Sequence, residues 1–180
     1  DKANVRINGP ALIDYGNIPQ NTEKTVQTFL TNDTVLDALN LSVTVSNTHN
    51  TIEFNGGSYP GTNGTCSSAL GSFQNCILDF KILSNNLGTI SENLTINYND
   101  NHILTPVDVS KTTPLAMNIV TLGKLELIEE NSIPNTTPTT FPPNAPGTNT
   151  KHILTFKNTG QYPISMVSAS LLNDPTQTIQ

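Results

Sequence analysis

The sequence contains no tryptophan, and only 12% of its 180 residues are charged. Its eight Lys and Arg residues are scattered singly and are outnumbered by fourteen Asp and Glu residues, which gives a net charge of −6. Binding to nucleic acid needs clustered Lys and Arg, so this balance argues against a nucleic-acid partner. No run of 18 apolar residues occurs, and we therefore expect no transmembrane segment.

Motifs that carry chemistry are also missing. The sequence has no Gly-x-Ser-x-Gly elbow, no Gly-rich phosphate loop and no HExxH. His49, His102 and His152 lie far apart, and none has an Asp, Glu or Cys at metal-ligand spacing. We therefore expect no catalytic residue, no cofactor and no metal site, and we predict that the chain is not an enzyme.

A few carboxylates could in principle pair to hold calcium. Glu129 and Glu130 end one strand-like run, and Asp100 sits in a turn with Asp108 downstream. Calcium sites are built from such oxygen ligands, but no Asp-x-Asp spacing is present. Ordinary turn chemistry, in which an Asp side chain bonds its own backbone, is the preferred interpretation. Calcium binding is left open.

The sequence is instead rich in Asn and Thr, and twelve prolines and eleven glycines interrupt it every few residues. Such a composition disfavours long helices and suits short strands joined by turns. Two alternating runs are clearest, with apolar residues at every second position, and their inward-facing members are Cys76, Leu78, Phe80 and Ile82, then Leu94, Ile96 and Tyr98. A period of two predicts half-buried strands.

Strands are predicted at seven places in the first two thirds of the chain. They are residues 11–15, 24–31, 38–46, 51–54, 76–83, 90–98 and 115–122. About seven short strands with frequent turns are typical of an immunoglobulin-like β-sandwich. The predicted fold class is therefore all-β.

The only two cysteines, Cys66 and Cys76, lie just before and at the start of the fifth predicted strand. A bridge between them would close a loop of about 11 residues and contribute roughly 2.5–3 kcal/mol. The alternative is a pair of reduced thiols in a cytosolic protein. We predict the disulfide, and with it an extracytoplasmic location.

The chain partly repeats itself. The run from Lys24 to Phe29 (KTVQTF) returns 127 residues later from Lys151 to Phe156 (KHILTF), and a turn and an alternating run follow each copy. Upstream, residues 12–15 correspond to residues 125–128. We predict one domain at residues 1–122 and the start of a second at 123–180. The second is incomplete, either because the natural protein continues or because a partner chain supplies the missing strands.

Four segments occur in an order shared with a known family: Asn17-Ile18-Pro19, Lys24-Thr25-Val26, the Cys66…Cys76 pair, and the stretch from Leu87 to Tyr98. In this order the chain resembles the bacterial choice-of-anchor D repeats, relatives of the Hydin-like immunoglobulin-like domains. Asn32-Asp33 departs from the family's Asn-x-Gly turn. The resemblance implies an exported, often surface-attached bacterial protein with tandem sandwich modules and no catalytic residues.

These observations predict a non-enzymatic structural or adhesive module. Its loops, chiefly residues 55–68 and 133–150, and its sheet edges would contact a protein or cell-surface partner, or other copies of itself. Two alternatives are open. One is a subunit of a larger cell-envelope or filament assembly whose domains are completed between chains, and the other is an accessory domain of an exported enzyme.

Overall fold

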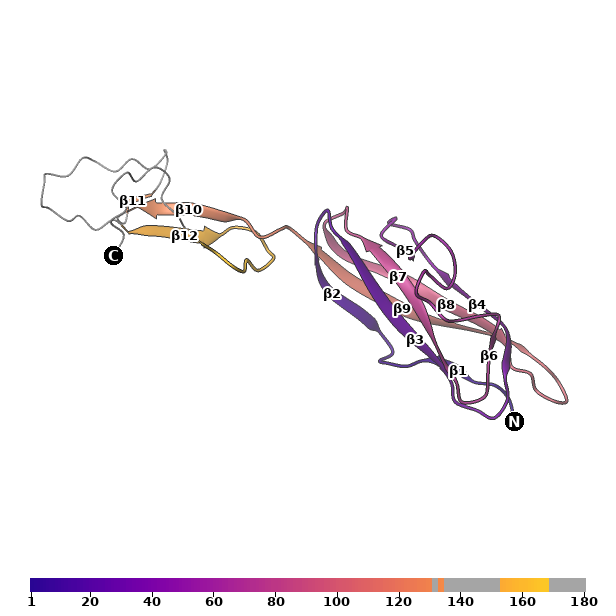
Figure 1. Ribbon diagram of the computed structural model, residues 1–180. Coiled ribbons are helices and arrows are strands. Elements are labelled where there is room, and N and C mark those ends of the chain that lie inside the picture. The colour runs from indigo at the N-terminus through magenta and orange to yellow at the C-terminus, as the bar shows by residue number, and fades with distance from the viewer. Residues whose placement is uncertain (131–132, 135–152, 169–180) are drawn as a thin grey trace, which may run out of the picture. The chain divides into compact units, whose positions relative to one another are not determined.

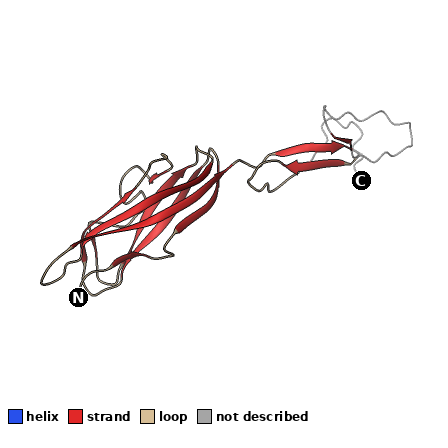
Figure 2. Cartoon of the chain, turned by 180° about the vertical axis from the view of Figure 1, so that it is seen from behind, coloured by secondary structure: helices blue, strands red, loops and turns tan. Residues whose placement is uncertain are grey.

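The computed structural model describes residues 1–130, 133–134 and 153–168. All regular structure in these ranges is β-strand, as Figure 2 shows in red, and the predicted all-β immunoglobulin-like fold is confirmed. The chain divides into two compact units, Asp1–Thr121 and Leu122–Gln180. This division lies one residue before the boundary expected from the sequence repeat.

The first unit is a sandwich of two sheets (Figure 1). One sheet has four strands in the order β1 (Val5–Ile7), β3 (Glu23–Asn32), β7 (Asn75–Leu83) and β5 (Ile52–Phe54). The other has five, in the order β2 (Ile13–Pro19), β9 (Asp108–Val120), β8 (Gly88–Asn99), β4 (Ala38–Val45) and β6 (Ala69–Leu70). The chain thus changes sheet between β1 and β2, and β2 pairs with β9 in parallel, whereas the other neighbours are antiparallel.

The core lies between β7 and β8, where the predicted alternation places apolar side chains inward. Leu78, Phe80 and Ile82 of β7 are fully buried, and Leu94 and Ile96 of β8 are at most 1% exposed. Each such side chain contributes on the order of 1.5–3 kcal/mol relative to full exposure. On β8 the residues that alternate with these apolar ones are polar, and this is why the strand could be predicted from the sequence.

Asn32 holds one end of this core together by hydrogen bonds. Its side chain is completely buried at the end of β3. Its amide nitrogen donates to the carbonyls of Leu36 and Leu70, at 2.7 and 3.1 Å. Its amide oxygen accepts from the backbone N–H of Asn4 and the hydroxyl of Thr34, at 3.3 and 3.0 Å. One side chain therefore ties the N-terminal segment, the β3–β4 connection and β6 to the end of β3.

The structure differs from the sequence prediction mainly at strand ends. β1 and β6, of three and two residues, were not predicted. β2 covers Ile13–Pro19 where residues 11–15 were expected, and its register is interrupted between Asp14 and Asn17. β9 begins at Asp108, seven residues earlier than expected, because its first half is polar and largely exposed.

The second unit contains β10 (Leu125–Glu130), β11 (Ile133–Pro134) and β12 (Leu154–Asn158), paired antiparallel in the order β11-β10-β12. β12 carries the last three residues of the repeated segment, Leu154 to Phe156. In the repeat, β12 corresponds to β3. β10 pairs antiparallel with β12 just as β1 pairs antiparallel with β3, so by its pairing β10 corresponds to β1. The sequence repeat had instead aligned β10 with residues 12–15. The loop expected at 133–150 lies, from residue 135 on, outside the described residues.

Candidate functional site

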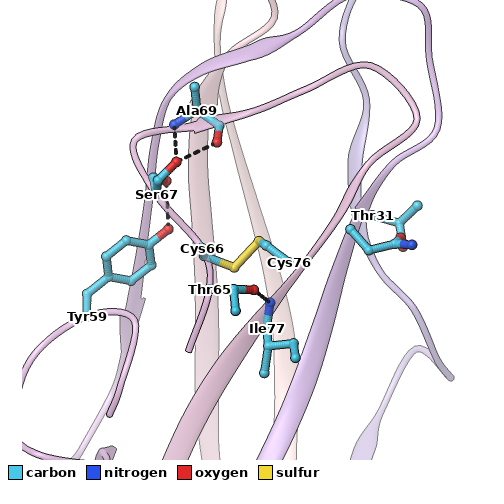
Figure 3. The surroundings of a disulfide bond; sticks show 9 residues. Thr31, Tyr59, Thr65, Cys66, Ser67, Ala69, Cys76 and Ile77 are labelled. Carbon is cyan, nitrogen blue, oxygen red and sulfur yellow. Dashed lines mark hydrogen bonds between the residues drawn. A yellow bond between two sulfur atoms is a disulfide. The ribbon is translucent and has the colours of Figure 1, made fainter. Parts of the chain in front are cut away.

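The two cysteines form the predicted disulfide, shown in Figure 3. Cys66 and Cys76 are joined by an S–S bond of 2.00 Å, with their Cα atoms 4.8 Å apart, and both residues are 5% exposed. Beside the bond, the Thr65 N–H donates to the Ile77 carbonyl, and the Ile77 N–H donates to the Thr65 hydroxyl, both at 2.9 Å. The disulfide therefore fixes the end of the long loop to the start of β7.

The rest of this loop, residues 55–64, folds over the buried side chain of Asp79. Asp79 Oδ2 accepts from the Asn55 amide at 2.9 Å and from the Asn63 backbone N–H at 3.1 Å. The Asp79 N–H donates to the Pro60 carbonyl at 2.9 Å. The loop passes so close to the strand that a Cβ on Gly61 would lie 2.1 Å from the Asp79 carbonyl oxygen. The predicted binding loop is thus a fixed structure.

An aromatic cluster supports the same loop from its other side. The Phe54 ring stacks on Phe80 at a centroid distance of 5.0 Å and meets Tyr59 edge-on at 5.6 Å. The Tyr59 hydroxyl donates to the Ser67 carbonyl at 3.1 Å. Burial raises the pKa of Tyr59 to about 12, so its hydroxyl keeps its proton and this hydrogen bond at physiological pH.

A second buried carboxylate fixes the connection between β4 and β5. Glu92 lies on the inner face of β8 and is 2% exposed. Its oxygens accept from the hydroxyls of Ser46 and Thr48, at 2.6 and 2.9 Å, and lie 2.8 Å from His49 Nδ1. Burial alone would raise the pKa of Glu92, but the hydrogen bonds from Ser46, His49 and Thr48 outweigh it and lower the pKa to about 2. The carboxylate is therefore ionised at neutral pH.

The contacts of this cluster are structural, since they hold the β4–β5 connection against β8. We call the cluster the Glu92 clamp. A carboxylate and a histidine in contact also occur in catalytic triads, where the far imidazole nitrogen activates a nucleophile. Here the Ser46 hydroxyl donates to Glu92 and accepts from the Asn93 N–H at 2.7 Å. The Thr48 hydroxyl contacts Glu92 and the same Nδ1 atom of His49. Neither hydroxyl is paired with the outer nitrogen of His49, so the contacts hold the loop in place.

At the other end of β8, the turn to β9 presents apolar side chains to solvent. Asp100 Oδ1 accepts from the backbone N–H groups of His102 and Val107, at 3.2 and 2.8 Å, and these bonds fix the turn. The backbone hydrogen bond from Val107 is the main cause that lowers the pKa of Asp100. Ile103 and Leu104 are nevertheless 79% and 84% exposed. We call residues 100–107 the hairpin tip; it lies at the same end of the first unit as the N-terminus (Figure 1).

The other carboxylates and histidines weighed as ligands are dispersed. Asp108 accepts from the Asn99 amide at 3.0 Å, and His102 accepts from the Thr105 N–H at 3.2 Å, which is turn chemistry. His152 lies outside the described residues. Within the described ranges no group of three or more His, Cys, Asp and Glu side chains is placed to hold a metal ion. No helix in those ranges is long and apolar enough to cross a membrane.

Two features were missed from the sequence. Glu92 falls in phase with Ile90 and Leu94, so a charged residue stands at a core position of β8, and that phase was a usable signal. Ile103 and Leu104 are apolar residues inside a segment otherwise made of turn residues, which was a second signal. The loops predicted to bind were identified by their length and by their turn-forming or polar, Pro-rich composition, and neither property identifies an exposed apolar tip.

No family model matches the sequence, and no curated protein matches it. Among solved structures, the VesB protease of Vibrio cholerae is similar at 9% identity and a TM-score of 0.49, over 63% of this chain and 31% of that one. The ASH / PapD-like domain 7 of human CEP192 is similar at 14% identity and a TM-score of 0.43, over 66% and 86%. The CsuC-CsuE chaperone–tip adhesion subunit complex of Acinetobacter baumannii is similar at 12% identity and a TM-score of 0.37, over 64% and 57%.

The chain spans less than a third of the VesB chain that it resembles. At these identities the likeness concerns the fold alone.

Proposed function

We propose that this chain is a non-enzymatic, exported bacterial module with a structural or adhesive role, which presents preformed loops to a protein partner. The observation that carries the proposal is the hairpin tip. Its backbone is fixed by Asp100, and yet Ile103 and Leu104 are held almost wholly in solvent. Two adjacent aliphatic side chains on a fixed turn would lose apolar surface to a protein partner, which favours a contact there.

The energetics suit such a role. Burying two aliphatic side chains against a partner would contribute roughly 1.5–3 kcal/mol each. Because the turn is already formed, little conformational entropy is lost when it binds. The loop at residues 55–64 is fixed in the same way by Asp79 and by the disulfide. Both surfaces are therefore preorganised.

The disulfide supports export. A buried intramolecular bond between the only two cysteines is typical of oxidising compartments and rare in the cytosol. The bacterial origin rests on the likeness to the choice-of-anchor D repeats. Thiol labelling of the natural protein in its own cells, followed by mass spectrometry with and without reductant, tests the compartment, and two free thiols in the native protein would argue against export.

A second candidate is a subunit of a cell-envelope or filament assembly. It is favoured by one observation, the edge of β9 that no strand of the described chain covers between residues 108 and 113. In an assembly this edge would be filled by a neighbouring chain.

The proposed role is tested by binding to envelopes of the producing bacterium after deletion of the gene for this protein, so that binding to resident copies is excluded. We compare the full chain with Ile103→Asp and Leu104→Asp together. Leu87→Asp is the matched control, since Leu87 is also exposed (52%) but lies just before β8, at the opposite end of that strand from the tip. The double variant should bind at least about 100-fold more weakly, since roughly 3 kcal/mol or more is lost. Equal binding by all three proteins would contradict the proposal.

A further inference from the structure

The first half of β9 is paired on one side only. β8 pairs with β9 from Asp108 to Ile119, whereas β2 pairs with it only from Leu115 to Val120. Residues 108–113 therefore form a sheet edge, and no other strand of the described chain lies beside it. An uncovered edge is a template for another strand.

The hydrogen-bond pattern shows which backbone groups face outward. The Asp100 N–H donates to the Val107 carbonyl, so that pair is of the hydrogen-bonded kind. The Ser46 N–H donates to the Asn93 carbonyl, so Asn93 turns its backbone toward β4 and away from Pro114, its partner on β9. Between Val107 and Pro114, successive residues of β9 alternately point their backbone N–H and C=O toward β8 and away from it. The groups of three exposed residues therefore point away from β8: Asp108, Ser110 and Thr112.

Two apolar surfaces flank this edge. The hairpin tip, with Ile103 and Leu104, precedes it in the chain. Beyond its other end, where the chain crosses from β1 to β2, lies a groove of about 180 Å³ whose lining includes Ile7, Pro10 and Ile13. Because Ile13 pairs with Leu115, this groove begins where the free edge ends.

We propose that two copies of this chain pair antiparallel along residues 108–112 of β9, about a twofold axis at Ser110. The proposal goes beyond the proposed function, because it names a second copy of the chain as a partner for this edge. In this register Ser110 faces its own counterpart and Asp108 faces Thr112 of the partner subunit. The outward-facing N–H and C=O groups of Asp108, Ser110 and Thr112 on each copy then bond to the same three residues of the partner subunit, as a twofold interface requires.

The same register brings the tip to the groove. At about 3.4 Å per residue, Leu115 lies about 17 Å from the axis along β9. Leu104 lies in the turn before β9, at most about 20 Å from the axis in the other direction. Antiparallel pairing reverses the partner, so the tip of one copy reaches the start of β2 on the other. Both tips are covered at once, because the axis relates the two contacts. An unrelated extended peptide would fill the edge but would leave the tip exposed, and this difference favours a second copy.

The charges along the edge permit this pairing. Lys111 points toward β1, where its ammonium group donates to Asn4 Oδ1 at 2.6 Å and to the Val5 carbonyl at 2.8 Å. Asp108 faces a threonine, and its counterpart on the partner lies four pairs away, at about 14 Å along the strand. That separation exceeds the screening length of about 8 Å at physiological salt.

Sedimentation equilibrium of the full chain tests the association. We expect a dimer with a dissociation constant below about 100 µM, as for a small specific interface. Ser110→Pro removes an outward N–H without touching a bond to β8, and Pro114 already occupies an equivalent position in the same strand. Ser110→Pro and Leu104→Asp should each weaken dimerisation at least tenfold, whereas Leu87→Asp should change it less than twofold.

A cysteine scan tests the register. Cα atoms of a hydrogen-bonded antiparallel pair lie about 5.5 Å apart, within the range that a disulfide can span. Ser110→Cys should therefore form an intermolecular disulfide readily under mild oxidation, and Thr112→Cys, which faces Asp108 of the partner subunit, should form it at least about tenfold more slowly. Equal rates would overturn the register.

Three results would overturn the dimer. They are a monomer at about 200 µM, a dimer that Ser110→Pro and Leu104→Asp leave intact, and an extended peptide that binds the edge of a monomeric chain. Binding to gene-deleted envelopes uses no second copy, so the proposed function can survive the failure of this inference, and the reverse also holds.

Discussion

Glu92 provides the sharpest test of how the loops are held. The substitution Glu92→Gln keeps the shape of the side chain but removes its charge and turns one acceptor into an N–H donor. The hydroxyls of Ser46 and Thr48 and the His49 N–H all donate to this carboxylate. The amide can satisfy only part of them, and a buried donor left without a partner costs on the order of 1–3 kcal/mol.

The magnitude follows from the pKa. Hydrogen bonds that outweigh the effect of burial lower the pKa of Glu92 from 4.5 to about 2. At 1.36 kcal/mol per pH unit this difference corresponds to roughly 3.4 kcal/mol. Half of the His49 side chain is exposed, which lets water screen part of the interaction. We therefore expect Glu92→Gln to lower the free energy of unfolding by about 2 kcal/mol near neutral pH.

The sign of the pH dependence is fixed by the direction of the shift. Because folding lowers the pKa of Glu92, its contribution is complete above the unfolded value of 4.5 and is lost as the pH falls toward about 2. The stability difference between the wild type and Glu92→Gln should thus be constant above about pH 5 and should fall below about 0.5 kcal/mol near pH 2.

Urea unfolding followed by far-ultraviolet circular dichroism measures this difference, since the sequence has no tryptophan. Glu23→Gln is the control, because Glu23 has a side chain 69% exposed and lies 4.0 Å from the Lys81 ammonium group. It should change stability by less than about 0.5 kcal/mol. A Glu92→Gln effect that stays constant between about pH 5 and pH 2, or that is absent near neutral pH, would refute the clamp.

Three further outcomes are expected. Replacing Cys66 and Cys76 by Ala should lower the free energy of unfolding by about 2.8 kcal/mol, as measured by urea titration against the oxidised wild type; no change would contradict the loop-closure account. Gly61→Ala should destabilise by more than about 2 kcal/mol, because its Cβ meets a strand carbonyl, whereas Gly57→Ala, with positive φ but open space, should cost about 1 kcal/mol. Difference spectroscopy at alkaline pH should show Tyr59 ionising at about 12; ionisation near the ordinary value of a free phenol would show that the ring is not packed.

The strands that could be predicted are those whose two faces meet different environments. On β8, Ile96 and Tyr98 face the core and Thr95 and Asn97 do not, so the sequence alternates plainly. The first half of β9 could not be recognised, because its inward side carries Lys111 and the strand has a neighbour on one side only. Where a sheet edge is uncovered, apolar alternation weakens, and so does its signal in the sequence.

The site was predictable only where a single pairing was possible. Two cysteines allow one disulfide, and Cys66–Cys76 is present. The partners of the buried carboxylates could not be predicted from the sequence, because their hydrogen-bond donors are distant in the chain and only the fold places them nearby. Ser46 lies 46 residues from Glu92 in the chain. The phase of Glu92 on β8 marks it as buried, but nothing local shows which loop it holds.

The buried carboxylates, the disulfide and the exposed tip have a common physical basis. Loops made mainly of Asn, Gly, Ser and Thr have few apolar side chains with which to anchor themselves on a thin core. A carboxylate that accepts several hydrogen bonds can anchor such a loop, as Asp79, Glu92 and Asp100 each do. Once the backbone is fixed from within, apolar side chains at the surface are not needed to hold it, and Ile103 and Leu104 are two that remain in solvent. The core of the sandwich is apolar, and the buried carboxylates are the exceptions that their hydrogen bonds make tolerable.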